Sequence, residues 1–279
     1  MCRLRTAFII ALLLLPALIC AGENLNRKED TAGPESASPQ TSEILRKKAF
    51  EEEHPDFTFP ARKKRYFYHG DRNSRLVALT FDDGPHPSYT PRLLALLREK
   101  KVPATFFLTG ENAHYYPHIV REIVSSGCEL GNHSYTHPNL RKLTPEKVRE
   151  ELARTQEQIK KASNVTPRVL RLPYGISSQD VARIAYKMKL DLFFWSLDTH
   201  DWEKKTSKQD IVKTVLEKTR GGSIILMHDK SQKVIDAVGE LIDPLREKGF
   251  EFVTCSELAD RLRLKQDREK KEKFTQKKQ

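Results

Sequence analysis

The chain has few cysteines, and they form no recognisable pattern. Four occur in 279 residues, and two of them, Cys2 and Cys20, fall within the first 22 residues. The remaining two, Cys128 and Cys255, are so far apart in sequence that they predict neither a disulfide framework nor a zinc-binding motif. We therefore interpret them as small apolar side chains that are at least half-buried.

A hydrophobic run as long as an ordinary membrane span is also missing. The apolar run Ala7–Cys20 is short and is broken by Pro16. It follows two arginines and precedes small residues, which is the pattern of an export signal. We therefore expect residues 1–22 to be a signal peptide that directs the protein to the periplasm, the cell wall or the medium. A retained membrane anchor and lipidation at Cys20 are alternatives. Lipidation is disfavoured because Ile19 stands where a small residue would be expected.

Motifs typical of nucleic-acid binding are absent, although the chain is basic. Its net charge of +11 and its pI of about 9.4 suit an anionic partner such as a cell-wall polymer, a membrane surface or nucleic acid. The sequence contains no helix-turn-helix pattern, zinc-finger spacing or RNP-like aromatic motif, which argues against nucleic acid. At 38% hydrophobic and 31% charged residues, the composition is that of a globular protein with polar appendages.

Two polar segments flank a more regular centre. Residues 23–65 contain several prolines and many charges, which predicts a linker. Residues 264–279 form a tail that we expect to be disordered or a frayed helix, because residues 265–279 hold seven basic and three acidic side chains. The positive charge of this tail would favour contact with anionic wall polymers. Residues 66–263 remain as the expected folded domain.

Within this domain, strand-like and helix-like patterns alternate about seven times. The strand candidates are 76–81, 104–109, 128–132, 169–172, 190–195, 223–227 and 250–254. The helix candidates are 90–100, 117–126, 144–164, 178–189, 208–220 and 232–248, with a short last helix that ends near residue 264. The alternation predicts an α/β fold of mostly parallel strands, as a nearly closed barrel or an open doubly wound sheet. Either form would place a functional site at the carboxyl ends of the strands.

Polar side chains gather at the ends of five of these strands. The clusters are Asp82-Asp83, His133 with His137, Arg171, Asp198 with Asp201, and His228-Asp229. Taken alone, the Asp82-Asp83 pair also fits a simple turn at a strand end. Five such clusters are hard to explain by structural side chains alone. Because adjacent strand residues point to opposite faces, the two aspartates would need different roles or a kinked strand end.

The two histidines predict a metal site. His133 and His137 are four residues apart and can bind one ion, with a carboxylate as the third protein ligand. Such a set leaves coordination positions open, as a catalytic metal requires. Zinc is the default divalent ion for imidazole and carboxylate ligands, and Co²⁺, Ni²⁺ or Fe²⁺ would also fit.

The clusters belong to five longer motifs that occur in a fixed order. These are TFDDGP (80–85), HSYTH (133–137), RLPYG (171–175), WSLDTHDW (195–202) and LMHD (226–229). They resemble the motifs of the polysaccharide deacetylase family (NodB-homology domain, carbohydrate esterase family 4), which includes chitooligosaccharide and peptidoglycan N-acetylglucosamine deacetylases. The resemblance covers about residues 70–262 and implies a distorted (β/α)7 barrel with its helices outside. Many relatives have a second proline at the position of Leu172, and we expect that difference to change only the shape of the groove.

The resemblance implies a role for each motif residue around the metal. Asp83, His133 and His137 would hold the ion. Asp82 would be the general base that takes a proton from the attacking water. Arg171 would orient this base and keep it ionised, because a neighbouring cation favours the charged form of a carboxyl group.

The resemblance also implies an acid and a substrate pocket. His228 would be the general acid that protonates the leaving amine, and Asp198 would lie beside it and favour the imidazolium. The backbone N–H of Tyr174 would bind the developing oxyanion. Trp202 and Leu226 would form the wall around the acetyl methyl, although ordinary core packing would explain these two side chains equally well.

The implied activity is metal-dependent hydrolysis of N-acetyl groups on N-acetylglucosamine residues of peptidoglycan, chitin or a similar poly-N-acetylglucosamine. Removal of O-acetyl groups from xylan uses the same chemistry and stays open as an alternative. A glycan-binding wall protein without catalysis is a third interpretation. We expect a monomer that contacts its polysaccharide substrate, and anionic wall polymers in addition, but no nucleic acid.

Overall fold

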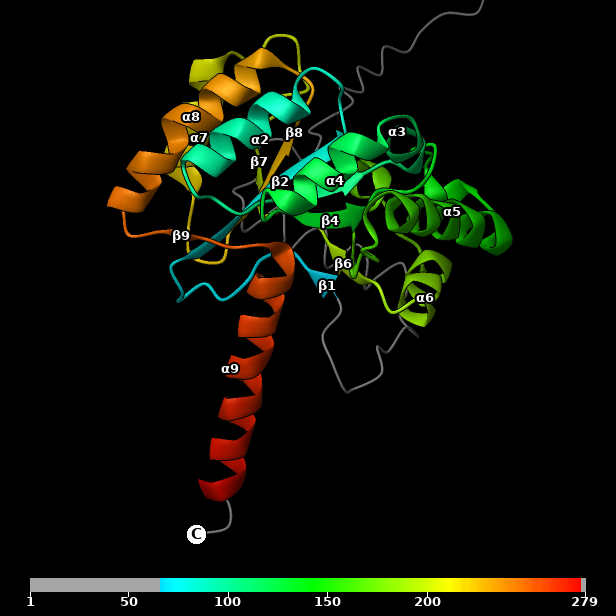
Figure 1. Ribbon diagram of the computed structural model, residues 1–279. Coiled ribbons are helices and arrows are strands. Elements are labelled where there is room, and N and C mark those ends of the chain that lie inside the picture. Colours follow the sequence, from blue (N-terminus) through cyan, green and yellow to red (C-terminus); the bar gives the residue numbers. More distant parts are fainter. Residues whose placement is uncertain (1–65, 277–279) are drawn as a thin grey trace, which may run out of the picture. The chain divides into compact units, whose positions relative to one another are not determined.

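The central region has the α/β fold that the alternating pattern predicts. The computed structural model describes residues 66–276. The signal peptide and linker expected over residues 1–22 and 23–65, and the end of the tail, lie outside this part of the chain. Figure 1 shows one twisted sheet with helices packed around it and a long helix that leads to the C-terminus. Among the described residues, no helix combines the length and the apolar composition that a bilayer crossing requires.

Nine strands of the described chain form one sheet, and their pairings are parallel. Along the sheet they follow in the order β1 (Tyr66–Phe67), β6 (Asp191–Phe193), β5 (Val169–Leu170), β4 (Glu129–Asn132), β3 (Thr105–Leu108), β2 (Leu76–Gly84), β8 (Ile224–His228) and β7 (Leu197–Asp198). A further strand, β9 (Glu251–Phe252), pairs with the start of β2. The sheet curls into a half-barrel whose strand order ends at β1 and β7. The expected distorted barrel of parallel strands is thereby confirmed.

Helices connect the strands and cover the outside of the sheet. They are α2 (Thr90–Glu99), α3 (Gly110–Tyr115), α4 (Pro117–Ser125), α5 (Pro145–Ser163), α6 (Gln179–Lys187), α7 (Lys208–Lys218), α8 (Gln232–Glu247) and α9 (Cys255–Gln276). The six helices predicted between residues 90 and 248 are all present, with ends within two residues of those expected. The apolar pattern did not indicate α3, because a helix of six residues is too short for a clear period.

Local sequence explains where the longest of these six predicted helices begins and ends. At the start of α5, the Thr144 hydroxyl accepts a hydrogen bond from the backbone N–H of Lys147, and Pro145 occupies the first turn. The helix ends at Asn164, which has a left-handed φ of 62°. These capping residues lie within the predicted bounds, so the sequence was sufficient to place this element.

Strand β2 crosses the centre of the core and leads directly to the polar clusters. Residues 77–81 are fully buried, with β3 on one side and β8 on the other. A parallel strand covered on both faces must be almost wholly apolar, and here Thr80 is the exception. Its hydroxyl donates to the backbone carbonyl of Ile225. Since the strands are parallel, the residues that follow β2, β4, β5 and β8 meet at one edge of the half-barrel.

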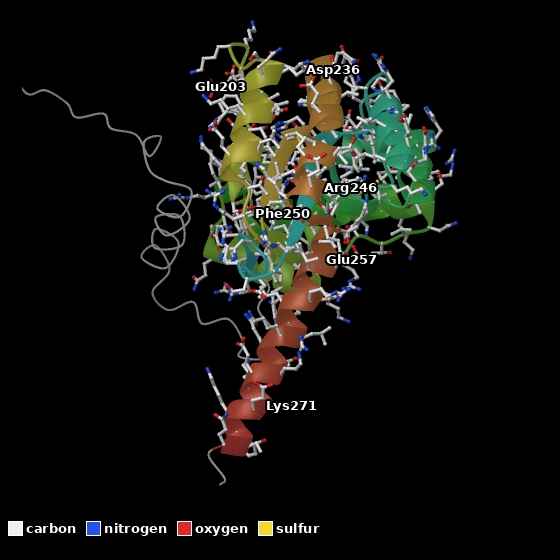
Figure 2. All side chains as sticks on the ribbon, turned by 90° about the vertical axis from the view of Figure 1, so that its left-hand side faces the viewer. Glu203, Asp236, Arg246, Phe250, Glu257 and Lys271 are labelled. Atoms are coloured by element: carbon white, nitrogen blue, oxygen red, sulfur yellow. The ribbon has the colours of Figure 1, made fainter. Side chains whose placement is uncertain are left out.

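Helix α9 is longer than the sequence predicts. We expected a short helix ending near residue 264 and a disordered or frayed tail, but the helix continues to Gln276. Its first turns bury Cys255 and Leu258 against the base of the sheet. Beyond residue 266 its side chains are exposed, and Figure 2 shows Lys271 on this outer part. Packing against the sheet therefore holds the first turns of α9, and charged residues with good helix propensity continue the helix beyond them.

The two halves of α9 should contribute very differently to stability. We expect Leu258→Ala to lower the free energy of unfolding by about 2–5 kcal/mol, because it empties a buried site. Deletion of the chain from residue 267 onward removes side chains that are exposed over residues 267–276, and it should change this free energy by less than about 0.5 kcal/mol. Urea unfolding followed by circular dichroism measures both changes. A larger loss from the deletion than from Leu258→Ala would contradict this division of α9.

Candidate metal centre and active site

The end of β2 turns both aspartates toward the same site. The strand register shifts between Asp82 and Gly84, and Asp83 has a φ of 71°. This bulge interrupts the alternation of an extended strand. Consequently both carboxylates lie near one imidazole: Nε2 of His133 is 3.8 Å from Asp82 Oδ2 and 3.3 Å from Asp83 Oδ1. The sequence left open whether the two aspartates have different roles or the strand end is kinked, and the structure has the kinked end.

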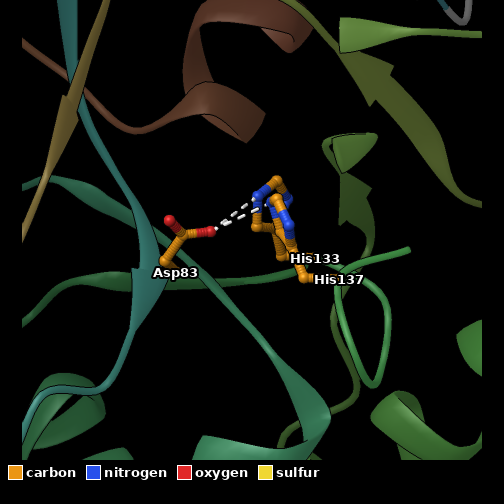
Figure 3. A group of neighbouring side chains, drawn as sticks. All are labelled: Asp83, His133 and His137. Atoms are coloured by element: carbon orange, nitrogen blue, oxygen red, sulfur yellow. Dashed lines mark ion pairs between the residues drawn. The ribbon is translucent and has the colours of Figure 1, made fainter. Parts of the chain in front are cut away.

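Asp83, His133 and His137 form a compact group of possible metal ligands (Figure 3). Asp83 Oδ1 lies 3.3 Å from His133 Nε2 and 3.2 Å from His137 Nε2. This oxygen is buried, and no described residue donates a hydrogen bond to it. One carboxylate oxygen and two imidazole nitrogens that converge in this way are a donor set for a divalent ion. The three residues therefore fit the metal that the spacing of His133 and His137 predicts.

Neighbouring groups keep these side chains in the form that a metal binds. His133 Nδ1 donates to the backbone carbonyl of Arg171 over 2.8 Å, which leaves Nε2 as the free acceptor. Burial alone would raise the pKa of Asp83, but His133, when its ring is protonated, and the Lys230 ammonium hold this pKa well below its usual range. Burial, with a smaller contribution from the positive charges of His133 and Lys230, lowers the pKa of His137 against the opposing effect of Asp83 and Asp82. An ionised carboxylate and a neutral imidazole are what metal binding requires.

Asp82 is held by a fully buried guanidinium. Arg171 Nη1 donates to Asp82 Oδ1 over 2.8 Å and to the Thr80 hydroxyl over 2.7 Å. Its other nitrogens donate to the backbone carbonyls of Phe193 and Phe194. With 0% of its side chain exposed, Arg171 depends on these partners for compensation of its charge. The structure thus places Arg171 where it can orient the carboxylate of Asp82.

The carboxylate beside His228 is Asp201, and the expectation that Asp198 lies there is wrong. His228 Nδ1 donates to Asp201 Oδ1, and the His228 backbone N–H donates to Asp201 Oδ2, each over 3.0 Å. The Thr199 hydroxyl also donates to Asp201 Oδ1. Asp198 instead accepts a hydrogen bond from the His200 backbone N–H. The turn after β7, with His200 at a φ of 53°, directs the later aspartate of the motif inward.

This contact favours the protonated form of His228. Burial alone would lower the pKa of His228, but the hydrogen bond and charge of Asp201, with smaller effects of Asp82 and Asp83, raise it to about 9. His228 is the register partner of Asp82 on the adjacent strands. A carboxylate and a protonated imidazole therefore lie side by side at the edge of the sheet, as a base and an acid could.

The three predicted pocket residues differ in exposure. Tyr174 and Trp202 are 62% and 61% exposed, whereas Leu226 is buried on β8. Tyr174 adopts a left-handed φ of 61° in the turn Pro173–Gly175, and its ring packs edge-on against His137 at 4.8 Å. Trp202 packs near the ring of His200. Tyr174 and Trp202 are thus open to a ligand, while Leu226 could only form part of a wall.

Sequence reasoning missed two residues that contact Asp83. Lys230 Nζ lies 2.5 Å from Asp83 Oδ2, and the Asn112 side-chain amide donates to the Asp83 backbone carbonyl over 2.8 Å. Lys230 directly follows the LMHD motif, two positions after His228, which was a usable sign. Asn112 lies on α3, which the sequence did not predict. Both line a polar cavity of about 240 Å³ that opens beside Asp83 and His137.

A parallel half-barrel with an Asp-His-His group at the carboxyl ends of its strands is the architecture of a metal-dependent barrel enzyme. Residues 69–193 match the family model "Polysaccharide deacetylase". A peptidoglycan-N-acetylglucosamine deacetylase of Bacillus cereus is 39% identical over 196 residues, which cover 69% of this chain and 71% of the relative. The chain belongs to the polysaccharide deacetylase family.

Two further comparisons agree with this assignment. A chitooligosaccharide deacetylase of Bradyrhizobium sp. is 37% identical over 194 residues, which cover 64% of this chain and 88% of the relative. The crystal structure of the Bc1960 peptidoglycan N-acetylglucosamine deacetylase superposes with a TM-score of 0.68 at 37% identity, covering 71% of this chain and 94% of that one. The similarity therefore includes the fold as well as the sequence.

We expect Asp201→Asn to lower the pKa of His228, because the amide removes the negative charge that favours the imidazolium. The removal of a close opposite charge typically changes a pKa by about 1–3. NMR titration of the His228 imidazole measures this pKa in the wild type and in the variant. The matched variant Asp198→Asn should leave it almost unchanged, and a greater effect of Asp198→Asn would refute the pairing of His228 with Asp201.

Proposed function

We propose that the protein is a metal-dependent hydrolase that removes N-acetyl groups from N-acetylglucosamine residues of a polysaccharide. Peptidoglycan is the first candidate, because the relatives named above include peptidoglycan deacetylases, and chitin-like polymers are the second. The proposal rests on the groups of side chains that meet at one edge of the half-barrel. Three metal-ligand side chains, a carboxylate fixed by arginine and a protonated imidazole all meet there.

Asp83, His133 and His137 would hold the ion, with zinc first and Co²⁺, Ni²⁺ or Fe²⁺ also compatible with these ligands. When bound, such an ion polarises a carbonyl group and makes water a stronger nucleophile. Asp82 would accept the proton of the attacking water while the water oxygen bonds to the acetyl carbon. Arg171, which also donates to the Thr80 hydroxyl, would hold the carboxylate of Asp82 in place during this transfer.

His228 would complete the reaction as the acid. An amine leaves poorly unless it is protonated, so the carbon–nitrogen bond breaks as a proton reaches the nitrogen. His228 Nδ1 is engaged by Asp201, so Nε2 is the atom that would donate. The products are acetate and a free amino sugar. The neighbouring positions of Asp82 and His228 on β2 and β8 support this division into base and acid.

The substrate would lie across the exposed aromatic side chains. Tyr174 and Trp202 offer faces and edges on which a sugar can pack, and Leu226 would line the wall near the acetyl methyl. The backbone N–H of Tyr174 would bind the carbonyl oxygen as it gains charge. The polar cavity beside Lys230 adds hydrogen-bonding groups next to the metal ligands, which suits the hydroxyl groups of a glycan.

The alternatives have less support. Removal of O-acetyl groups from xylan would use the same residues, but neither relative named above is an acetylxylan esterase. A glycan-binding protein without catalysis would not require the base, the acid and the metal ligands together. All of these residue types occur here at one site.

A substrate panel tests the proposal. We expect the zinc-loaded protein to release acetate from peptidoglycan, chitin oligomers or poly-N-acetylglucosamine in preference to acetylxylan. A chelator should abolish the release and added zinc should restore it. Asp83→Ala should reduce the rate by about a hundred-fold or more, since even changes to residues behind metal ligands cost 10–100-fold. Asp236→Ala, an exposed acid on α8, is the control.

Two results would count against the proposal. Full activity of Asp83→Ala or of the chelated protein would exclude the metal assignment. Acetate release from acetylxylan alone would replace N-deacetylation by the ester reaction.

We also propose that the protein is exported and acts on a polymer outside the cytoplasm, with its basic tail in contact with anionic wall polymers. The pattern in residues 1–22 supports export. Expression of the full chain in a bacterium, followed by fractionation and N-terminal sequencing, tests this. We expect protein outside the cytoplasm whose first residue lies close to position 23. Retention in the cytoplasm with an intact N-terminus would refute it.

A further inference from the structure

The two oxygens of the Asp83 carboxylate have different surroundings. Oδ1 is buried near the Nε2 atoms of His133 and His137, and no described residue donates a hydrogen bond to it. Oδ2 lies 2.5 Å from the ammonium of Lys230, on the side of the polar cavity. One oxygen is therefore available to an ion, and the other is already occupied by a cation of the chain itself.

We propose that Lys230 is a positioning residue of the metal site, which holds Asp83 Oδ2 and so restricts Asp83 to a single ligand oxygen. A carboxylate can bind an ion through one oxygen or both. If Asp83 used both, it would fill a coordination position that a catalytic ion keeps open for water or substrate. The inference rests on the metal site of the proposed function, but it concerns how this chain arranges that site.

Asp83 is fixed at both its backbone and its side chain. The Asn112 amide donates to its backbone carbonyl over 2.8 Å, and Lys230 contacts its carboxylate. Groups behind the ligands commonly orient them, and their removal costs about 10–100-fold in metal affinity. Lys230 comes from the loop after β8, whereas the three ligands come from the ends of β2 and β4. Lys230 therefore links β8, the strand that carries His228, to the metal site.

Lys230 also repels a divalent ion. Its charge therefore weakens metal binding, while its orientation of Asp83 strengthens it. Its side chain is 52% exposed, and water screens the charge of a group this exposed. Interactions of exposed charges typically change an equilibrium by less than about five-fold. Loss of the orientation of Asp83 is expected to change the metal affinity by more than this factor. Replacement of Lys230 should therefore weaken metal binding, although removal of a positive charge alone would strengthen it.

Metal binding, measured without any substrate, tests the inference. Competition with a chromophoric chelator gives the zinc affinity of the wild type, Lys230→Met, Lys230→Arg and Lys208→Met. Lys208 is the matched control, because its ammonium also lies 2.5 Å from an acid, Glu240, on helices α7 and α8. We expect about ten-fold weaker binding for Lys230→Met. Lys230→Arg, which keeps the charge and the N–H donors, and Lys208→Met should stay within about three-fold of the wild type.

The visible absorption of bound Co²⁺ provides a second measurement. This absorption weakens as the number of ligands rises, so it should fall in Lys230→Met, where Asp83 is free to bind through both oxygens, and recover in Lys230→Arg. Equal or tighter zinc binding by Lys230→Met with an unchanged Co²⁺ spectrum would overturn the inference, as would an equal loss in Lys230→Arg. Failure of the wild type to bind zinc would instead overturn the metal site itself.

Discussion

The buried guanidinium of Arg171 is the interaction on which the site depends. Its side chain joins Thr80 and Asp82 of β2 to the carbonyls of Phe193 and Phe194, and its own carbonyl accepts the hydrogen bond that orients His133. An ion removed from water is costly unless charges and hydrogen bonds replace the lost hydration. The same contacts that compensate Arg171 therefore fix the proposed base and a metal ligand relative to each other.

Backbone strain is concentrated around the same edge. Among residues 66–276, eight non-glycine residues have a positive φ, and those in the five motifs are Asp83, Ser134, His137, Tyr174 and His200. Such conformations are costly and persist where surrounding contacts impose them. Here they redirect the chain at the bulge near the end of β2, after a strand or within a turn. The stable parallel sheet thus supports short, unfavourable turns that aim polar side chains at one point.

Environment gives chemically equal side chains different tasks. His137 has its pKa lowered mainly by burial, whereas Asp201 raises that of His228 to about 9. One imidazole is thereby suited to bind a metal and the other to donate a proton. Likewise Asp82 faces the guanidinium of Arg171, while Asp83 offers one buried oxygen and pairs the other with Lys230. Pairs of like groups in contrasting surroundings are typical of acid–base sites.

The sequence by itself determined the mostly parallel α/β architecture and the six helices between residues 90 and 248, because these follow from local periodicity and capping. The spacing of His133 and His137 indicated a metal site, and the resemblance to the polysaccharide deacetylases selected Asp83 as the third ligand. Only the tertiary structure decided contacts that depend on loop conformation. The turn at His200 selects Asp201, and not Asp198, as the partner of His228, and the bulge at Asp83 brings both aspartates together. Lys230 meets Asp83 across 147 positions. A one-dimensional pattern identifies the side chains available at a strand end, but the turn geometry decides which of them meet.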